Sequence, residues 1–318
     1  MERMHDANTV PGFLFPDVEL FSAVELAARS GMTLIAAKTL WRSLGFPEVD
    51  ENTPYFSAED LAALNTVQKL IEEDVIDLEG AIRLGRLIGT ASARIAEAGI
   101  AALHERGSES ALEHMELEDV VDRMESILGY AWRRQLHAAL VRFDKSGRTG
   151  QSGPFHREMG VGFADLAGFT ERAATVSLAS LAYLTRQFEE VTSLAISSVG
   201  GRVIKLIGDG VMFVAETPEE LVACADGVKS VCGADSCLPS VRIGLAWGEL
   251  LLQNGDYFGP DVNLASRMVS SVPVGVIALS NSLHRLLGPS ERWENILLKN
   301  IKGLGDCEVW IDRVEHAN

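Results

Sequence analysis

The pattern of apolar and polar positions changes near the middle of the chain. Between residues 80 and 104 apolar side chains recur three and four positions apart, from Leu84 to Ala98, which predicts a helix with one buried face. A second long helix is predicted over residues 112–141, with polar Gln135 interrupting its apolar stripe. That stripe follows a 4-3-4-3-7 spacing at Leu117, Val121, Met124, Leu128, Ala131 and Ala138. The spacing fits a short coiled-coil-like seam between two chains, and a core helix of the same domain equally well.

A Gly- and Ser-rich stretch without periodicity, residues 145–154, is predicted to be a linker. Beyond it, strand-like and helix-like segments alternate. They are a buried strand at 159–166, a helix at 177–198, a hairpin at 202–215, a helix at 218–232, a strand at 240–253, a helix at 261–271, a strand at 275–280 and a final hairpin at 293–314. This order predicts an α/β (α+β) domain with a mixed sheet at 155–318, preceded by a mostly α-helical domain at 1–144.

Composition fits two globular domains and argues against a nucleic-acid partner. The 318 residues are 47% hydrophobic and 23% charged, and the net charge is −17. Both parts are acidic, with 15 basic against 25 acidic residues up to residue 150 and 13 against 20 after it. Because nucleic acids are bound by basic surface, we expect no such partner. A polyanionic substrate would require bound cations or a few well-placed basic groups.

The expected location is the cytoplasm. No apolar run reaches the roughly 18–20 residues that a membrane span needs, and the N-terminus has no apolar signal-peptide core. We therefore expect no membrane partner. Reduced thiols are expected because no C-x-x-C spacing occurs among Cys224, Cys232, Cys237 and Cys307.

Two carboxylates fall where predicted strands end. Asp165 follows an apolar strand, and Asp209 lies at the Gly-Asp-Gly tip of the predicted hairpin. Two such groups on neighbouring strands would suit hard divalent cations, which prefer oxygen ligands. Taken singly, Asp209 is also explained as a turn residue and Asp165 as a cap.

A polar pair follows on the predicted helix at 261–271. Asn263 and Arg267 are four residues apart, so their side chains project from one face. An amide and a guanidinium together suit a phosphate whose charge grows in a transition state, although a solvated polar face is the simpler explanation. The apolar residues of the opposite face are Val262, Leu264, Ala265 and Met268.

Five segments in order resemble the motifs of class III adenylyl and guanylyl cyclases. They are FADLAGFT at 163–170, KLIGDGVMF at 205–213, VRIGLAWGE at 241–249, DYFGPDVNLASR at 256–267, and Lys302-Gly303. Five motifs over about 150 residues are highly specific. The resemblance implies the ferredoxin-like, palm-type fold of that family, and it implies an adenylate cyclase.

The resemblance also implies a role for each matching position. Asp165 and Asp209 correspond to the two metal-binding aspartates, with the Leu166 backbone as a further ligand, and two Mg²⁺ or Mn²⁺ ions are implied per active site. Asn263 and Arg267 correspond to residues that hold the ribose and stabilise the transition state. The substrate-binding positions are the base-selecting pair Lys205 and Asp256 and the polyphosphate-binding Arg242 and Lys302.

The Lys205 and Asp256 pair predicts ATP over GTP. A lysine donates to adenine N1 and an aspartate accepts from the adenine amino group, whereas guanine presents the reverse pattern. Each unpaired buried group would cost roughly 1–3 kcal/mol. In the resembled family the metal aspartates come from one chain and the Lys/Asp and Asn/Arg pairs from the other, so we expect a homodimer with two composite sites.

The helical half supplies the alternative function. Residues 25–33, 40–46 and 56–61 resemble a MerR-type winged helix-turn-helix, which would make the chain a DNA-binding regulator with a nucleotide-sensing C-terminal domain. The acidic residues around this segment oppose DNA contact. They are Glu48, Asp50, Glu51, Glu59 and Asp60. A diguanylate cyclase is disfavoured because the Gly-Gly-Asp/Glu-Glu-Phe turn is absent.

We expect the helical half to regulate the catalytic half, because the helix at 112–141 leads directly into the linker. The half is similar in kind to regulatory domains of soluble mycobacterial-type cyclases. His104, His114 and His137 could make regulation pH-dependent, or could be ordinary surface histidines. The apolar faces of the two long helices could enclose a lipid-like ligand, or could form packed core.

Overall fold

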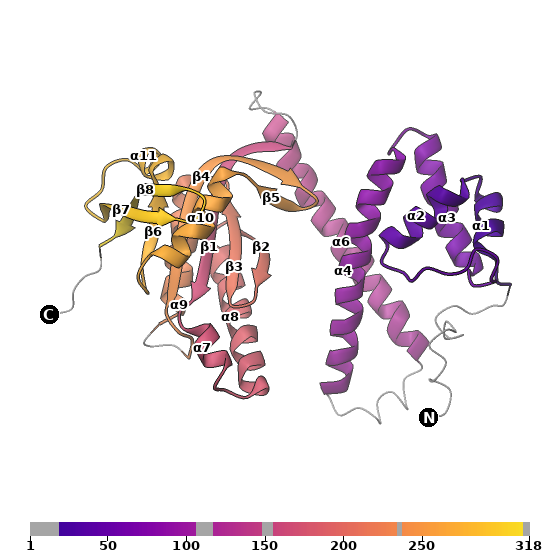
Figure 1. The fold of residues 1–318 in the computed structure, drawn as a ribbon, viewed down its shortest axis with the longest axis horizontal. Coiled ribbons are helices and arrows are strands. Elements are labelled where there is room, and N and C mark those ends of the chain that lie inside the picture. The colour runs from indigo at the N-terminus through magenta and orange to yellow at the C-terminus, as the bar shows by residue number, and fades with distance from the viewer. Residues whose placement is uncertain (1–18, 106–116, 148–154, 234–236, 314–318) are drawn as a thin grey trace. The chain divides into compact units, whose positions relative to one another are not determined.

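The contacts within the chain define two compact units, Met1–Arg142 and Phe143–Asn318. The structure is a computed structural model that describes residues 19–105, 117–147, 155–233 and 237–313 (Figure 1). The predicted residues His114 and 148–154 lie outside these ranges, as does the side chain of His104.

The N-terminal unit is helical, as predicted. Its helices are α1 (Ala23–Ser30), α2 (Leu34–Ser43), α3 (Ala58–Glu72) and α4 (Leu78–Glu105), and α6 (Leu117–Gly147) crosses the boundary between the units. Side-chain caps fix the N-termini of the first three helices. The capping residues are Ser22 with Glu25 for α1, Thr33 for α2, and Ser57 with Asp60 for α3. The first three residues of the predicted linker, 145–147, belong instead to α6, because residues 142–145 contain no proline or glycine that would end the helix earlier.

The core of the N-terminal unit lies among α1 to α4. A single backbone bridge between Phe21 and Phe56 joins the segments before α1 and α3. The Trp41 ring packs edge-on against Phe56, with the centroids 4.7 Å apart. The buried apolar residues of this core are Phe21, Ala23, Leu26, Ala27, Met32, Ala37, Leu40, Phe56, Leu64 and Ala81.

The C-terminal unit is built on one mixed sheet, which confirms the predicted fold class. Its strands are β1 (His156–Leu166), β2 (Arg202–Ile207), β3 (Gly210–Ala215), β4 (Val241–Gln253), β5 (Asp256–Phe258), β6 (Ile277–Ser280), β7 (Trp293–Ile301) and β8 (Gly305–Asp312). The order is β2-β3-β1-β4-β6-β8-β7, with β5 paired to β4 beside this path. Only the β4–β6 pair is parallel among the described strands.

Helices cover both faces of this sheet (Figure 1). They are α7 (Phe169–Ala173), α8 (Leu178–Ser198), α9 (Pro218–Val231), α10 (Pro260–Ser271) and α11 (Asn281–Leu287). Phe188 and Ile196 of α8 share one buried cluster with Phe213 of β3, whereas Met268 of α10 shares the other with Met212. The close approach of α10 to the sheet requires a glycine in β4, since a Cβ at Gly244 would overlap the Ala265 carbonyl.

None of the helices in the described part of the chain combines the length and the apolar character that a membrane crossing needs.

Candidate active site

The two candidate metal-binding aspartates lie side by side at one end of the sheet. Asp165 is the penultimate residue of β1 and is opposite Gly210 of β3, the residue that follows Asp209. The Leu166 backbone N–H donates to the Asp209 carbonyl at 3.1 Å. The turn itself depends on Gly208, which has a φ of +63°. The β2–β3 hairpin therefore delivers Asp209 directly to the end of β1.

This pair is electrostatically unfavourable without a cation. The pKa of Asp165 is raised to about 6, first by burial and then by the charge of Asp209, while Arg242 on the neighbouring β4 opposes the rise. Asp165 and Asp209 lie together in a partly buried position and offer only oxygen ligands, so the pair suits a hard divalent cation. Arg242 Nε is buried and has no hydrogen-bond partner among the described residues.

The candidate base-selecting residues also meet within one chain. Lys205 of β2 and Asp256 of β5 form a salt bridge between Nζ and Oδ2, although the two strands are not neighbours in the sheet. The other Asp256 oxygen accepts from the Tyr257 backbone N–H at 2.8 Å. Both side chains remain partly exposed, so a ligand can reach them.

The remaining candidates stand apart from these contacts. Asn263 and Arg267 are exposed, one turn apart on α10, while Ala265 and Met268 of the opposite face are buried as predicted. Lys302 is exposed in the turn between β7 and β8. Among the described residues, no hydrogen bond or ion pair joins these three side chains to the aspartates.

Sequence reasoning missed two residues beside the base-selecting pair. Arg202 Nη2 donates to the Tyr257 hydroxyl at 2.8 Å, and its guanidinium carbon lies 5.5 Å from the centre of that ring. The strand pattern around Lys205 gave no signal for Arg202, because a regular strand places residues three apart on opposite faces.

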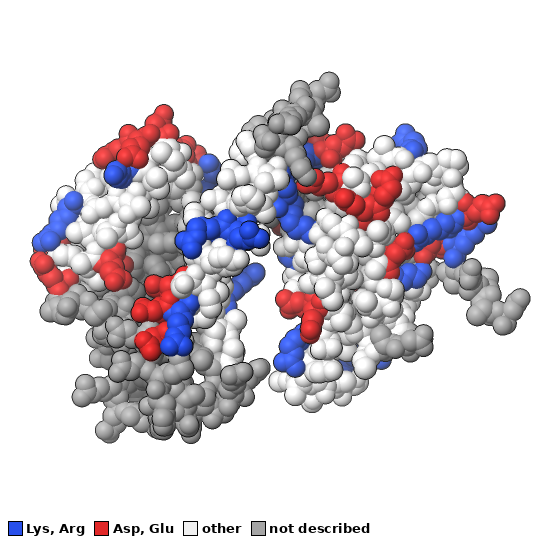
Figure 2. Space-filling model, turned by 180° about the vertical axis from the view of Figure 1, so that it is seen from behind, with Lys and Arg blue, Asp and Glu red and all other residues white. Residues whose placement is uncertain are grey.

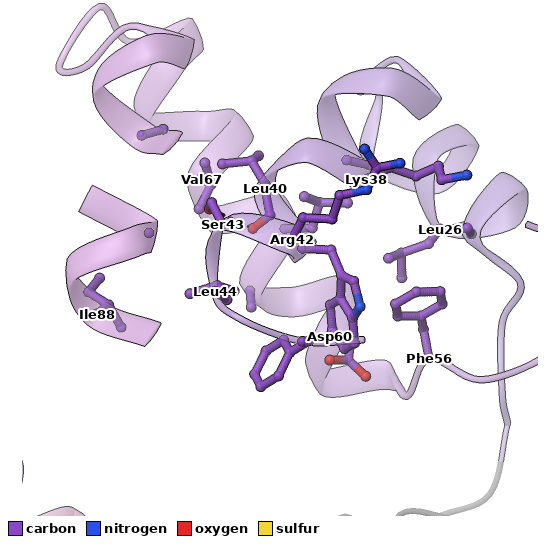
Figure 3. Close-up of a pocket in the computed structure, with 18 of the residues that line it drawn as sticks. Leu26, Lys38, Leu40, Arg42, Ser43, Leu44, Phe56, Asp60, Val67 and Ile88 are labelled. Carbon is purple, nitrogen blue, oxygen red and sulfur yellow. Dashed lines mark hydrogen bonds between the residues drawn. The ribbon is translucent and has the colours of Figure 1, made fainter. Parts of the chain in front are cut away.

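The N-terminal unit contains an apolar cavity of about 250 Å³, walled by residues from α1 to α4. Figure 3 shows Leu26, Leu40, Phe56, Val67 and Ile88 around it. The basic side chains at its edge are already paired with Glu48, which lies 3.4 Å from Lys38 Nζ and 2.7 Å from Arg42 Nη2. The cavity therefore offers a ligand mainly apolar surface.

Several known proteins are similar to this chain. Residues 153–311 match the model of the adenylate and guanylate cyclase catalytic domain. An adenylate cyclase of Glutamicibacter nicotianae is 33% identical over 91% of this chain and 78% of its own. A second, from Streptomyces coelicolor, is 28% identical over 87% of this chain and 74% of its own. The crystal structure of an adenylate/guanylate cyclase/hydrolase from Silicibacter pomeroyi aligns with 50% of this chain over 98% of its own chain, with 24% identity and a TM-score of 0.45.

The chain therefore belongs to the adenylate and guanylate cyclase family, and within it is an adenylate cyclase, a lyase that produces cyclic AMP. The enzymes of this family use divalent metal ions and bind a nucleotide substrate.

Proposed function

We propose that this enzyme converts ATP to 3′,5′-cyclic AMP and pyrophosphate by two-metal catalysis at composite sites of a homodimer. The observation that carries the proposal is the juxtaposition of Asp165 and Asp209, which places two oxygen-ligand groups where their mutual repulsion calls for a cation. Two Mg²⁺ or Mn²⁺ ions would be held by these carboxylates and the Leu166 carbonyl.

Each remaining residue acts on a different part of the nucleotide. When bound, the metals would lower the pKa of the ribose 3′-hydroxyl and offset the polyphosphate charge. Lys205 donates to adenine N1, while Asp256 accepts from the amino group. Asn263 orients the ribose, and Arg267 donates to the α-phosphate oxygens as their charge grows. Arg242 and Lys302 bind the polyphosphate.

Composite sites explain why these groups do not all meet within one chain. The aspartates lie at the β1 end, whereas Asn263 and Arg267 project from α10, and no hydrogen bond or ion pair among the described residues joins them to the aspartates. In the proposed homodimer, the aspartates of one chain face the Lys/Asp and Asn/Arg pairs of its partner. Each dimer then has two equivalent sites.

A complementation assay tests this arrangement. We expect Asp209→Ala and Asn263→Ala chains to be inactive alone, and a mixture to recover part of the activity through one intact site in each heterodimer. Wild-type enzyme, assayed with ATP and GTP and with each metal, should prefer ATP. No recovery in mixtures shown to exchange subunits would rule out composite sites, and equal use of both nucleotides would rule out the assigned base pair.

We also propose that the N-terminal unit regulates catalysis, since α6 runs from that unit into the catalytic one. A lipid-like ligand in the apolar cavity or a change of pH would be the signal. A pH-sensitive adenylate cyclase of Mycobacterium tuberculosis is 31% identical over 51% of this chain and 42% of its own, which supports the second option. Of the three histidines, His137 is exposed on α6.

Truncation tests regulation. A chain beginning at Phe143 should differ in activity from the full chain at some pH, or lose a response to fatty-acid-like additives. Equal activity at every pH and additive concentration would exclude regulation by the N-terminal unit.

The alternative of a DNA-binding regulator predicts saturable, salt-sensitive duplex binding. On the face in Figure 2, acidic and basic side chains are interspersed and the described residues form no continuous basic patch, which opposes it.

A further inference from the structure

A bulge in β2 brings two basic residues onto one face of the sheet. Arg202 is opposite Val214, Val203 is opposite Phe213, and the register then shifts so that Lys205 is opposite Met212. Val214 and Met212 belong to the cluster under α10, whereas Phe213 belongs to the cluster under α8 and α9. Without the extra residue, Arg202 and Lys205 would point to opposite faces. With it, both lie on the α10 face.

The partners of these two residues are adjacent on β5. Asp256 and Tyr257 directly follow a two-residue turn in which Asn254 and Gly255 have φ values of +54° and +76°. Left-handed conformation at both positions defines a tight hairpin turn that fixes the position of the next residue. Tyr257 then anchors the strand, because it is 2% exposed and packs in the cluster under α10.

Two side-chain contacts therefore connect β5 to β2, which do not pair through their backbones. One is the Lys205–Asp256 salt bridge. The other is the hydrogen bond from Arg202 to the Tyr257 hydroxyl, with the guanidinium over the ring. A buried tyrosine hydroxyl needs a hydrogen-bond partner, and Arg202 supplies it. The second contact involves neither base-selecting residue, so a nucleotide placed between Lys205 and Asp256 would not have to break it.

We propose that Arg202 and Tyr257 are positioning residues for purine selection. Their contact holds β5 against β2 so that Lys205 and Asp256 keep the spacing that matches adenine. This inference rests on the proposed role of Lys205 and Asp256. Without the contact, Asp256 moves on its hairpin relative to Lys205, and the pair discriminates less well between adenine and guanine.

Steady-state kinetics with ATP and with GTP test the proposal. In the full-length enzyme, Arg202→Met and Tyr257→Phe should each lower the ratio of kcat/KM for ATP to that for GTP by about tenfold, mainly through a higher KM for ATP. The double variant should be no worse than either single variant, because both remove the same contact. Arg202→Lys, which keeps a cationic donor, should retain most of the selectivity.

Arg186→Met is the matched control, since Arg186 also lies over a tyrosine ring, that of Tyr183, but on the exposed surface of α8. It should leave the ratio unchanged. An unchanged ratio in both single variants, or an equal fall of kcat for both nucleotides with a lower Tm, would overturn the positioning role. The wild-type ratio distinguishes this failure from a failure of the proposed function. If wild-type enzyme clearly prefers ATP while the variants keep its ratio, Lys205 and Asp256 still select the base and only the positioning role is wrong.

Discussion

The two units of this enzyme differ in how completely they bury their apolar surface. All of the large side chains that are fully buried among the described residues belong to the catalytic unit, including Phe188, Phe213 and Met268. The long helices of the N-terminal unit instead expose many large apolar side chains, such as Ile100 on α4 and Trp132 on α6. Apolar surface of this extent on a helix usually marks an interaction site. The long N-terminal helices thus keep more apolar surface exposed for association than the catalytic unit does.

The largest expected effect tests the chemistry of the catalytic unit. Asp209→Asn keeps the turn and its hydrogen-bonding atoms but removes the charge that a cation needs. We expect cyclase activity to fall by about 10³-fold or more, with Tm unchanged or raised. Coupled assay of pyrophosphate release, together with thermal unfolding, would measure both. A matched Asp119→Asn variant on the exposed surface of α6 should be fully active, and an active Asp209→Asn enzyme would contradict the proposed metal site.

A pair of glycine substitutions tests the difference in packing. A Cβ at Gly162 of β1 would overlap the Phe213 ring, whereas a Cβ at Gly99 of α4 meets nothing within 4 Å. Gly162→Ala should destabilise the catalytic unit by about 1–3 kcal/mol through overpacking. Gly99→Ala should be neutral or stabilising by up to about 1 kcal/mol, because alanine favours the helix. Urea unfolding measures each, and equal effects at the two sites would contradict the contrast.

Some elements of the catalytic unit could be predicted from the sequence and others could not. The hairpin that presents Asp209 was predictable from Gly208-Asp209-Gly210 between apolar runs, whereas its position beside Asp165 depends on the long-range pairing of β3 with β1. The three-residue strand β5 and the short helices α7 and α11 were missed, because such segments are too short for periodicity. The Asn254-Gly255 turn could have revealed β5.

The partner of Tyr257 could not be predicted at all. The bulge that turns Arg202 and Lys205 to one face contains no glycine and leaves no mark in the sequence. It arises where β2 packs on both core clusters, which is a tertiary effect. The seam on α6 likewise remained ambiguous, because the same spacing serves a core helix and an interface. Met124 and Leu128 are 37% and 38% exposed, which favours the interface.

A substitution on α6 tests that interface and the proposed homodimer. Leu128→Glu would place a charge into an apolar seam, where burial of an unpaired carboxylate is costly. We expect the dimer dissociation constant to rise by about tenfold or more, as measured by analytical ultracentrifugation. Arg133→Glu introduces the same side chain at an exposed polar position of α6 and should have little effect. Unchanged association in the Leu128 variant would place α6 outside any interface between chains.

The smallest expected effect concerns the stability of the protein when no metal is bound at the proposed site. Because the pKa of Asp165 is raised from 3.8 to about 6 in the folded state, folding favours the protonated form. Its stabilising contribution is complete below pH 3.8 and is lost as the pH rises through about 6. At pH 8 the wild-type protein therefore carries a partly buried charge beside Asp209, whereas Asp165→Asn does not.

In the presence of a chelator, Asp165→Asn should therefore raise Tm by about 2–4 °C at pH 8 and by less at pH 5. Added Mg²⁺ or Mn²⁺ should reverse the order, because only the wild-type carboxylate pair gains a ligand. Differential scanning fluorimetry at the two pH values resolves such shifts. A Tm difference that is the same at pH 5 and pH 8 would show that Asp165 does not titrate in this range.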